Sequence, residues 1–333
     1  MSRNLSCSQI VAEAIGIEME RDERIVVLGE DVGAIGGVFG ATRDLQRRFG
    51  DKRVRDMPIS EMAFTGMGVG LAMAGYRPIV EVMFADFIGA CLEQVYNAMA
   101  KIPFMSGGTM RMPMVLKTAG GCIGSAAQHS QCLWGLFAHL PGMKVVTPGS
   151  PYDYKGLMAS ALEGEDPVVY IEHQSQMSKK AATFRHGAEV PAERYTVPIG
   201  KAAVARQGRD LTLVTLSACV EQSLEAAETL FSEHIDVEVV DLRTVVPMDI
   251  ETVAGSVART QRLLVVDEDY LSFGVSGEVV ARVVELLGTT AVKQVGRHGN
   301  PDVPVPAAKT LEDAVLPRAG SIANAVRRMA AAS

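Results

Sequence analysis

Two ionisable side chains stand out because their sequence surroundings suggest chemistry: Glu61 and His129. Glu61 is the single ionisable residue in the run 58–75, and it would sit in the first turn of a helix. A buried carboxylate must find a partner or keep its proton, because unpaired burial costs several kcal/mol. Glu61 could therefore exchange a proton with a ligand. It could equally be a helix-start acid that the helix dipole favours.

His129 follows a glycine-rich segment, 119–124, and its neighbours Gln128, Ser130 and Gln131 are all able to form hydrogen bonds. Such a histidine could act on a ligand or could simply tie the loop together. His139, in the segment 137–142, fits the structural role better. Phe87 would by default be core packing. The residues alone therefore indicate a ligand-binding protein with a buried glutamate and a loop histidine, and leave both roles open.

The helix that would carry Glu61 is unusual in composition. Ser60 is a plausible N-cap and Gly75 a plausible C-terminal stop. Glycines at 66, 68, 70 and 75 each cost about 1 kcal/mol relative to alanine in an isolated helix. Such a helix is tolerable only where neighbours pack closely on every side. We therefore expect a central, buried helix.

Length and composition limit the class of protein. The chain has 333 residues, 48% of them hydrophobic, and a formal net charge of −7, which fits two globular domains, each with its own core. No stripe rich in Lys and Arg suggests nucleic-acid binding, and no apolar run of about 20 residues suggests a membrane span. The five cysteines are scattered without a C-x-x-C pair, so we expect neither disulfides nor a metal, and a cytoplasmic location.

Short apolar runs alternate with helical patterns along the chain, which indicates parallel sheets covered by helices on both faces. The predicted strands of the first half are 25–28, 78–84, 112–116, 144–147 and 167–171. A polar stretch over 174–208 interrupts the pattern, which then restarts with strands at 211–216, 237–242, 263–266 and 291–295 and a closing helix over 309–330. We predict two parallel-sheet α/β domains, 1–185 and 206–333, joined by a linker over 186–205.

Three segments whose side chains could take part in a reaction follow predicted parallel strands: the start of the Glu61 helix, the loop 84–87 and the loop with His129. Open α/β sheets bind ligands at the carboxyl ends of their strands. We therefore expect these three segments to lie close together.

Seven ordered segments resemble one family: LGEDV (28–32), PISEMAFTGMGVGLAMAG (58–75), VMFADF (82–87), MSGG (105–108), AQHSQ (127–131), PGMKVV (141–146) and DLRTVVPMD (241–249). The family comprises the beta subunits of the thiamine-diphosphate-dependent 2-oxo acid dehydrogenases and the related acetoin dehydrogenases. The resemblance covers nearly the whole chain. It implies a pyrimidine-binding domain with a thiamine-diphosphate-binding fold, followed by a transketolase C-terminal-like domain. It also implies an α2β2 tetramer with the cofactor between α and β chains.

The resemblance gives roles to individual residues. Glu61 matches the glutamate that hydrogen-bonds the cofactor's pyrimidine ring, so that the neighbouring amine can deprotonate the thiazolium carbon. Phe87 matches the aromatic residue that stacks on this ring, and Met83 is expected to contact the cofactor too. His129 matches the histidine that assists proton transfer and the handover of the acyl group to lipoamide.

Two further acids and a possible ion site also come from the resemblance. Glu30 and Glu93 match positions proposed to link distant active sites through a proton-conducting tunnel. Some relatives bind potassium in the beta subunit, largely through backbone oxygens around the positions of Met114, Ala161, Gly164 and Asp166. Gly164 and Asp166 stand where relatives often have Asp and Asn.

The chain lacks the GDG motif and the paired asparagines with which the family holds Mg²⁺ and diphosphate. An α subunit is therefore expected to supply the oxygen ligands of Mg²⁺.

The substrate and partners remain open between alternatives. The segments 84–92 and 150–153 look most similar to acetoin dehydrogenase beta subunits, whereas AQHSQ is shared by acetoin- and pyruvate-type members; a branched-chain 2-oxo acid is a third option. The resemblance also implies docking on a dihydrolipoyl acyltransferase core. Two other functions are considered: a catalytically silent assembly subunit, against which the presence of both Glu61 and His129 argues, and half of a split transketolase or synthase.

Overall fold

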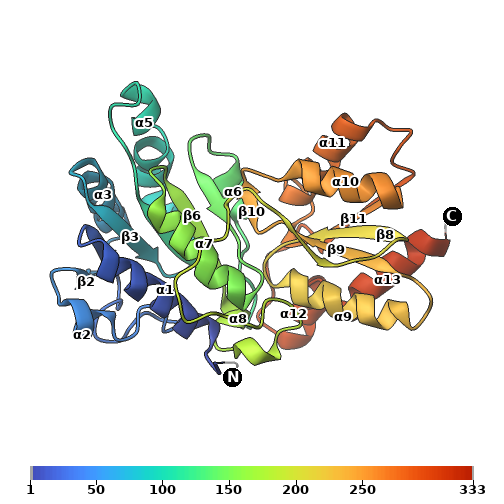
Figure 1. The fold of residues 1–333 in the computed structure, drawn as a ribbon, viewed down its shortest axis with the longest axis horizontal. Coiled ribbons are helices and arrows are strands. Elements are labelled where there is room, and N and C mark those ends of the chain that lie inside the picture. The colour runs from blue at the N-terminus through green and yellow to red at the C-terminus, as the bar shows by residue number, and fades with distance from the viewer. Residues whose placement is uncertain (1–2, 332–333) are drawn as a thin grey trace.

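The computed structural model describes residues 3–331, which form two α/β units lying side by side (Figure 1). The first unit holds a seven-stranded sheet in the order β10-β5-β6-β4-β3-β1-β2, and the second a five-stranded sheet in the order β12-β11-β8-β9-β7. The predicted fold class of two α/β domains is thus confirmed.

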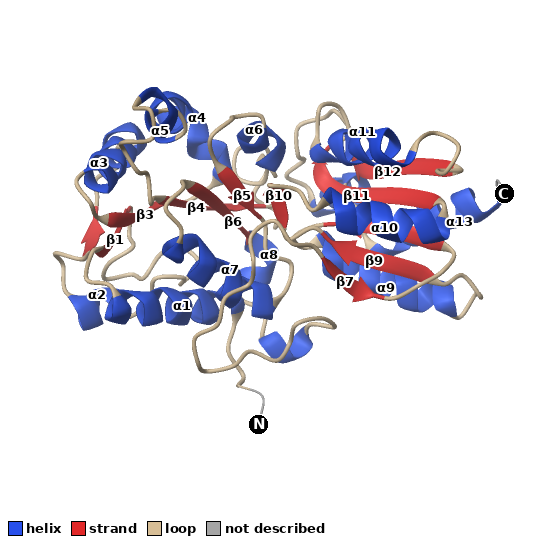
Figure 2. Ribbon diagram, turned by 45° about the horizontal axis from the view of Figure 1, so that its top comes forward, coloured by secondary structure: helices blue, strands red, loops and turns tan. Residues whose placement is uncertain are grey.

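The first sheet consists of β1 (Ile25–Gly29), β2 (Val54–Asp56), β3 (Arg77–Val82), β4 (Val115–Gly120), β5 (Lys144–Val146), β6 (Val168–His173) and β10 (Thr244–Val246). Helices α3 (Glu61–Met73), α4 (Ile88–Glu93), α5 (Ile102–Met105) and α6 (Trp134–Ala138) lie along one face (Figure 2). Helices α1 (Cys7–Arg21), α2 (Leu45–Phe49), α7 (Pro151–Glu163) and α8 (Gln174–Met177) lie along the other. A π-helical turn, Gln94–Met99, continues α4.

The second sheet consists of β7 (Ala203–Arg206), β8 (Leu211–Thr215), β9 (Val237–Asp241), β11 (Arg262–Tyr270) and β12 (Gln294–Asn300). Helices α10 (Ile250–Thr260) and α11 (Val275–Leu287) cover one face, and α9 (Cys219–Phe231) and α13 (Ala319–Ala331) the other, as Figure 2 shows. Helix α12 (Lys309–Val315) precedes α13, so the expected single closing helix is two helices with Pro317 between them. Proline cannot continue a helix because it lacks an N–H.

Local sequence explains several helix starts. Ser6 caps α1 through a capping box with Gln9, and Ser150 accepts a hydrogen bond from the backbone N–H of Asp153 at the start of α7, where Pro151 takes the first helical position. Ser60 precedes α3, but its hydroxyl donates to the Pro58 carbonyl at 3.0 Å instead of capping the helix. The Ser60 side chain therefore does not cap α3, and the predicted N-cap role is wrong.

The sheets are not wholly parallel, which corrects the prediction at two edges. Strand β10, from the second half of the chain, pairs antiparallel with β5 of the first sheet, and β7 pairs antiparallel with β9. Both strands are short, and β7 begins inside the segment predicted as a linker. An edge strand needs only one neighbour, so neither has to show the continuous apolar run of a central parallel strand.

The expected separate cores are also corrected. One buried cluster runs through both units, from Leu28 and Phe64 in the first to Val253 and Val279 in the second. Two further clusters lie on the outer faces, one under α1 and α7 and one under α9 and α13. The two units therefore share a hydrophobic interior. No helix in the described part of the chain is long and apolar enough to cross a membrane.

Helix α3 is not buried on every side. Phe64 and Val69 face the core, but Met62 is 55% exposed and Met73 42% exposed. The glycines divide in the same way: a Cβ at Gly68 would collide with Val80, whereas Gly70 faces open space. The prediction was therefore right for the inner face and wrong for the outer one. Within this chain, nothing in the described residues covers the outer, apolar face of α3.

A wholly buried charge cluster lies among the central strands of the first sheet. Lys117 Nζ is 2.9 Å from Glu81 Oε2 and 2.9 Å from Glu172 Oε2. Burial raises the pKa of Glu172 from 4.5 to about 7, against the opposing charge of Lys117 and helped by the charge of Glu81. The contribution of protonated Glu172 to stability is therefore full below pH 4.5 and is lost as the pH rises through 7.

We expect Glu172→Gln to gain stability relative to wild type as the pH rises from about 6 to about 9, by about 1 kcal/mol in the free energy of unfolding. The amide carries no charge to desolvate, yet its oxygen can still accept a hydrogen bond from Lys117. Denaturant titrations at both pH values measure the difference, with Glu23→Gln at the surface as the control. A difference that does not change with pH would contradict the assignment of this titration to Glu172.

Candidate active site

The three predicted segments gather at one edge of the first sheet. Glu61 begins α3 after β2, the 3-10 turn η1 (Ala85–Phe87) follows β3, and the loop with His129 follows β4. These strands belong to the contiguous set β4-β3-β1-β2, whose members all run parallel. Their carboxyl ends therefore meet at the same edge, as expected for an open α/β sheet.

The ring of His129 lies against two phenylalanines of the neighbouring loop. Its centroid is 4.9 Å from that of Phe84 and 5.2 Å from that of Phe87, both edge-on. Phe84 also contacts Phe39 at 5.8 Å, so the aromatic side chains form a continuous wall. Phe87 and His129 are both half-buried, and so neither belongs wholly to the core. The structure thus brings these two predicted residues together.

Glu61 lies near a second carboxylate, Glu30, which is the first residue after β1. The pKa of Glu30 is raised, first by burial and then by the charges of Glu61 and Asp31, while a backbone hydrogen bond from Ser60 opposes the rise. Oxygen Oε1 of Glu30 is buried and has no hydrogen-bond partner among residues 3–331. Two adjacent acids, one with an unsatisfied oxygen, suit a ligand that donates or shares protons.

A cavity of about 490 Å³ opens beside Glu61 and is lined by the first turns of α3 together with Ala90 and Gln94. The half-buried carboxyl group of Glu61 therefore faces space that a ligand could enter. Gln94 belongs to the π-helical turn, an irregularity that often marks functional sites. A carboxyl group beside an open cavity fits the heteroaromatic ring that the resemblance implies.

Of the predicted site residues only Glu61 lines this cavity, and Phe87 and His129 are not among its lining residues. Glu93 is exposed and accepts a hydrogen bond from Asn97 Nδ2 at 2.7 Å. Met83 is half-buried just after β3. At the expected potassium position, Arg77 Nη1 donates to the Gly164 carbonyl at 2.7 Å, and Asp166 pairs with Lys144 at 2.8 Å. Met114, which immediately precedes β4, and Ala161, which belongs to α7, are both buried.

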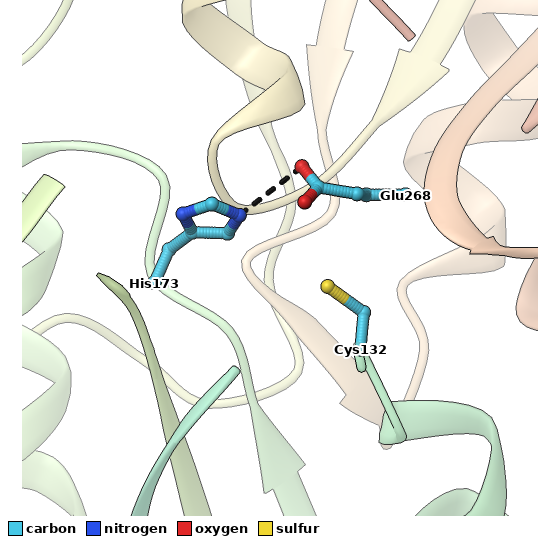
Figure 3. Close-up of side chains that lie close together, drawn as sticks. All are labelled: Cys132, His173 and Glu268. Atoms are coloured by element: carbon cyan, nitrogen blue, oxygen red, sulfur yellow. Dashed lines mark hydrogen bonds and ion pairs between the residues drawn. The ribbon is translucent and has the colours of Figure 1, made fainter. Parts of the chain in front are cut away.

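Three buried side chains meet where the two units touch: Cys132, His173 and Glu268 (Figure 3). Ligand-type atoms of all three lie within 4.8 Å of one another. The backbone N–H of Ser175 donates to His173 Nδ1 at 3.2 Å, so Nε2 carries the proton of a neutral ring and donates to Glu268 at 3.1 Å. A metal would need Nε2 without its proton. The geometry therefore supports a hydrogen bond between the units in preference to a metal site.

A larger cavity, of about 820 Å³, lies between α6, β10 and α11. Its ionisable side chains are His139, Asp269, Glu278 and Arg282, and the fully exposed Phe273 also lines it. The predicted site residues are not among those that line it. Sequence reasoning missed this cavity because its walls come from segments that are more than 100 residues apart.

The matching family models define the class of the fold. Residues 3–179 match the model described as "Transketolase, pyrimidine binding domain", and residues 200–322 match "Transketolase, C-terminal domain". A solved structure titled "Split gene transketolase, inactive beta4 tetramer" superposes with a TM-score of 0.78, at 22% identity and with 98% of each chain covered. The chain is therefore a two-domain protein of the transketolase type.

Full-length relatives are more specific. The chain is 41% identical to the acetoin:2,6-dichlorophenolindophenol oxidoreductase subunit beta of Cupriavidus necator, with 98% of each chain covered. It is 41% identical to the mitochondrial pyruvate dehydrogenase E1 component subunit beta of Bos taurus (96% of this chain, 89% of that one). It is 42% identical to the 2-oxoisovalerate dehydrogenase subunit beta of Bacillus subtilis, with 94% of each covered. The chain belongs to the family of beta subunits of thiamine-diphosphate-dependent 2-oxo acid and acetoin dehydrogenases, and its role is that of an oxidoreductase subunit.

Proposed function

We propose that this chain forms an α2β2 heterotetramer with an α subunit, cleaves acetoin or a 2-oxo acid, and passes the acyl group to lipoamide on a dihydrolipoyl acyltransferase core. The observation that carries the proposal is the placement of Glu61 beside an open cavity and near Glu30, at the edge of the sheet where Phe87 and His129 also lie. A cytoplasmic location is also proposed, since the five cysteines are all free and buried, which suits a reducing compartment.

Each side chain has a definite task in this proposal. Thiamine diphosphate, when bound, supplies a carbon acid whose anion attacks the substrate carbonyl. Glu61 would act as a general acid–base: it would accept a proton at the pyrimidine ring and return it. Phe87 would stack against that ring, and Met83 would also contact the cofactor. His129 would carry a proton during acyl transfer, because a histidine changes its charge near neutral pH.

Glu30 and Glu93 are proposed as members of a proton path between the two active sites of the tetramer. The interaction between Glu30 and Glu61 supports the first link, because the charge of Glu61 raises the pKa of Glu30. Glu93 lies at the surface of this chain, where a partner chain could reach it.

An α subunit is needed for two reasons. The sequence has no GDG motif for Mg²⁺ and diphosphate, so these would be held by the α subunit. The chain also exposes large apolar side chains at α3 and α5, which lie on the same face of the first sheet: Ile59 is 85% exposed, Met62 55%, Phe104 88% and Met105 68%. Obligate interfaces resemble a domain core cut in half, and these residues would supply one side of such an interface.

The test of this function is reconstitution. Alone, the chain should bind thiamine diphosphate weakly even with Mg²⁺, because the diphosphate ligands are on the other subunit. With an α chain that carries the GDG motif, we expect Mg²⁺-dependent binding and turnover of acetoin, pyruvate or 2-oxoisovalerate, followed with 2,6-dichlorophenolindophenol and then with lipoamide. Calorimetric detection of tight, Mg²⁺-dependent cofactor binding by the single chain would contradict the shared site.

The turnover assay also decides between the substrates. The relatives named for acetoin, pyruvate and 2-oxoisovalerate are 41%, 41% and 42% identical to this chain, so sequence identity does not choose between them.

Potassium binding near Met114, Ala161, Gly164 and Asp166 is also proposed. Replacing potassium chloride by choline chloride should then lower the melting temperature, and an unchanged temperature would remove this proposal.

A further inference from the structure

We propose that Asp86 is a positioning residue for His129: it holds the loop after β4 so that the imidazole stays against Phe84 and Phe87. The reaction role of His129 rests on the proposed function, whereas the placement of its ring rests on the contacts alone.

The contacts of Asp86 all go to one residue of that loop. One carboxylate oxygen accepts a hydrogen bond from the side-chain amide of Gln131 at 2.8 Å, and the other accepts from the backbone N–H of Gln131 at 3.3 Å. Gln131 lies two residues after His129. A carboxylate that accepts two bonds from one residue fixes both its backbone and its side chain.

The position of Asp86 links this clamp to the aromatic wall. Asp86 lies in η1, the single 3-10 turn that begins after Phe84 and ends at Phe87, closed by a hydrogen bond from Phe87 N–H to the Phe84 carbonyl at 2.9 Å. Both phenylalanines contact the His129 ring. One short turn thus supplies the surface for the imidazole and the anchor for the backbone beside it.

The loop needs such an anchor because its own backbone is irregular. Residues 121–133 contain no helix or strand, and Gly121, Gly124 and Ala126 have positive φ angles of 92°, 85° and 61°. On the far side, Gln174 Nε2 donates to the His129 carbonyl. Asp86 and Gln174 therefore hold residues 129–131 at two points, and loss of Asp86 removes the hydrogen bonds to one of them.

Asp86 acts through the loop and not on a substrate. Both of its carboxylate oxygens are engaged by Gln131, and Tyr270 Oη approaches Gln131 Oε1 at 3.5 Å from the second unit. Its variants should therefore move His129 without removing a group that takes part in the reaction.

The two variants Asp86→Ala and Asp86→Asn separate this role from a general loss of stability. Alanine removes both bonds. Asparagine can keep both, because its oxygen accepts from the Gln131 N–H and its amide donates to the Gln131 side chain after that amide turns over. Gln131→Ala removes one bond only. The matched control is Asp236→Ala, which breaks a 3.0 Å pair with Arg206 in the second unit.

The first readout needs only this chain. With histidine labelled in the ring, the carbon–proton signal of His129, assigned by its loss in His129→Gln, reports the ring currents of Phe84 and Phe87. We expect Asp86→Ala to move this signal towards that of free histidine and Gln131→Ala to move it part of the way. Asp86→Asn and Asp236→Ala should leave it in place. An unmoved signal in Asp86→Ala would overturn the proposal.

The second readout uses the reconstituted α2β2 enzyme. Displacement of a reacting group by about 1 Å costs about 10²-fold in rate, so Asp86→Ala should lose about that factor in lipoamide-linked turnover and Asp86→Asn less than about threefold. Equal losses in the two variants would overturn the positioning role. If the signal moves as expected while the wild-type enzyme shows no turnover, the positioning role is supported and the proposed reaction alone fails.

Discussion

Glu61→Gln is expected to reduce turnover of the reconstituted enzyme by about 10²–10⁴-fold, the usual contribution of a general acid–base. The amide fills the same space at the first residue of α3 and can still form hydrogen bonds, but it cannot accept and return a proton. Fold and assembly should therefore be preserved. Steady-state rates, together with the elution volume of the tetramer, measure both expectations.

A matched control tests the alternative role of Glu61 as a helix-start acid. Glu251 occupies the first turn of α10, in the second unit. Loss of an acid there should cost only the dipole contribution, about 0.3–1 kcal/mol of stability, and leave turnover unchanged. If Glu61→Gln behaves like Glu251→Gln, with turnover within about threefold of wild type, Glu61 serves the helix and not the reaction.

His129→Ala should divide the two halves of the reaction. In the proposed reaction, the first half needs the proton exchange at Glu61, whereas acyl transfer needs a proton delivered to a sulfur of lipoamide. An imidazole can carry that proton at physiological pH, and alanine cannot. We therefore expect turnover with 2,6-dichlorophenolindophenol to be largely retained and lipoamide-linked turnover to be lost, with both assays run on the same preparation.

The control and the contrary outcome are both specific. His139 is exposed and lies on the larger cavity, so His139→Ala should change neither assay. If His129 only supports its loop, its removal should lower the free energy of unfolding by about 1–3 kcal/mol and slow both assays alike. Equal loss in both assays with a lowered melting temperature would assign His129 a structural role.

The sequence predicted the order of most helices and strands because central parallel strands are buried on both faces. Runs such as Ile25–Gly29 and Val237–Asp241 consist mostly of β-branched and aliphatic residues, which is the pattern of a central parallel strand. The short strands Val54–Asp56 and Thr244–Val246 were missed because three residues show no period. The outer face of α3 was predicted to be buried because apolar residues do not reveal whether their neighbour lies in the same chain.

The site divides in a similar way. That Phe87 and His129 lie at one edge of the sheet could be predicted from strand order, because β3 and β4 were both predicted and such ends converge; the strand before Glu61, β2, was missed. Asp86 and Gln174 could not, because their partners lie 45 residues away in the chain and a single sequence holds no record of that contact. The position of Asp86 immediately before Phe87 was the one available sign. The placement of a side chain at a strand end is thus predictable, whereas the contacts that hold it there are not.

The strand β10 has a consequence for biosynthesis. It covers the edge of β5 but is made of Thr244–Val246, so the ribosome has released the first 243 residues before the first sheet can be completed. Until then, β5 is an exposed edge that could pair with another chain. Fragments that end between the two units keep that edge open, so they are poor substitutes for the intact subunit. Nascent chains would need protection for as long as the ribosome takes to reach this strand.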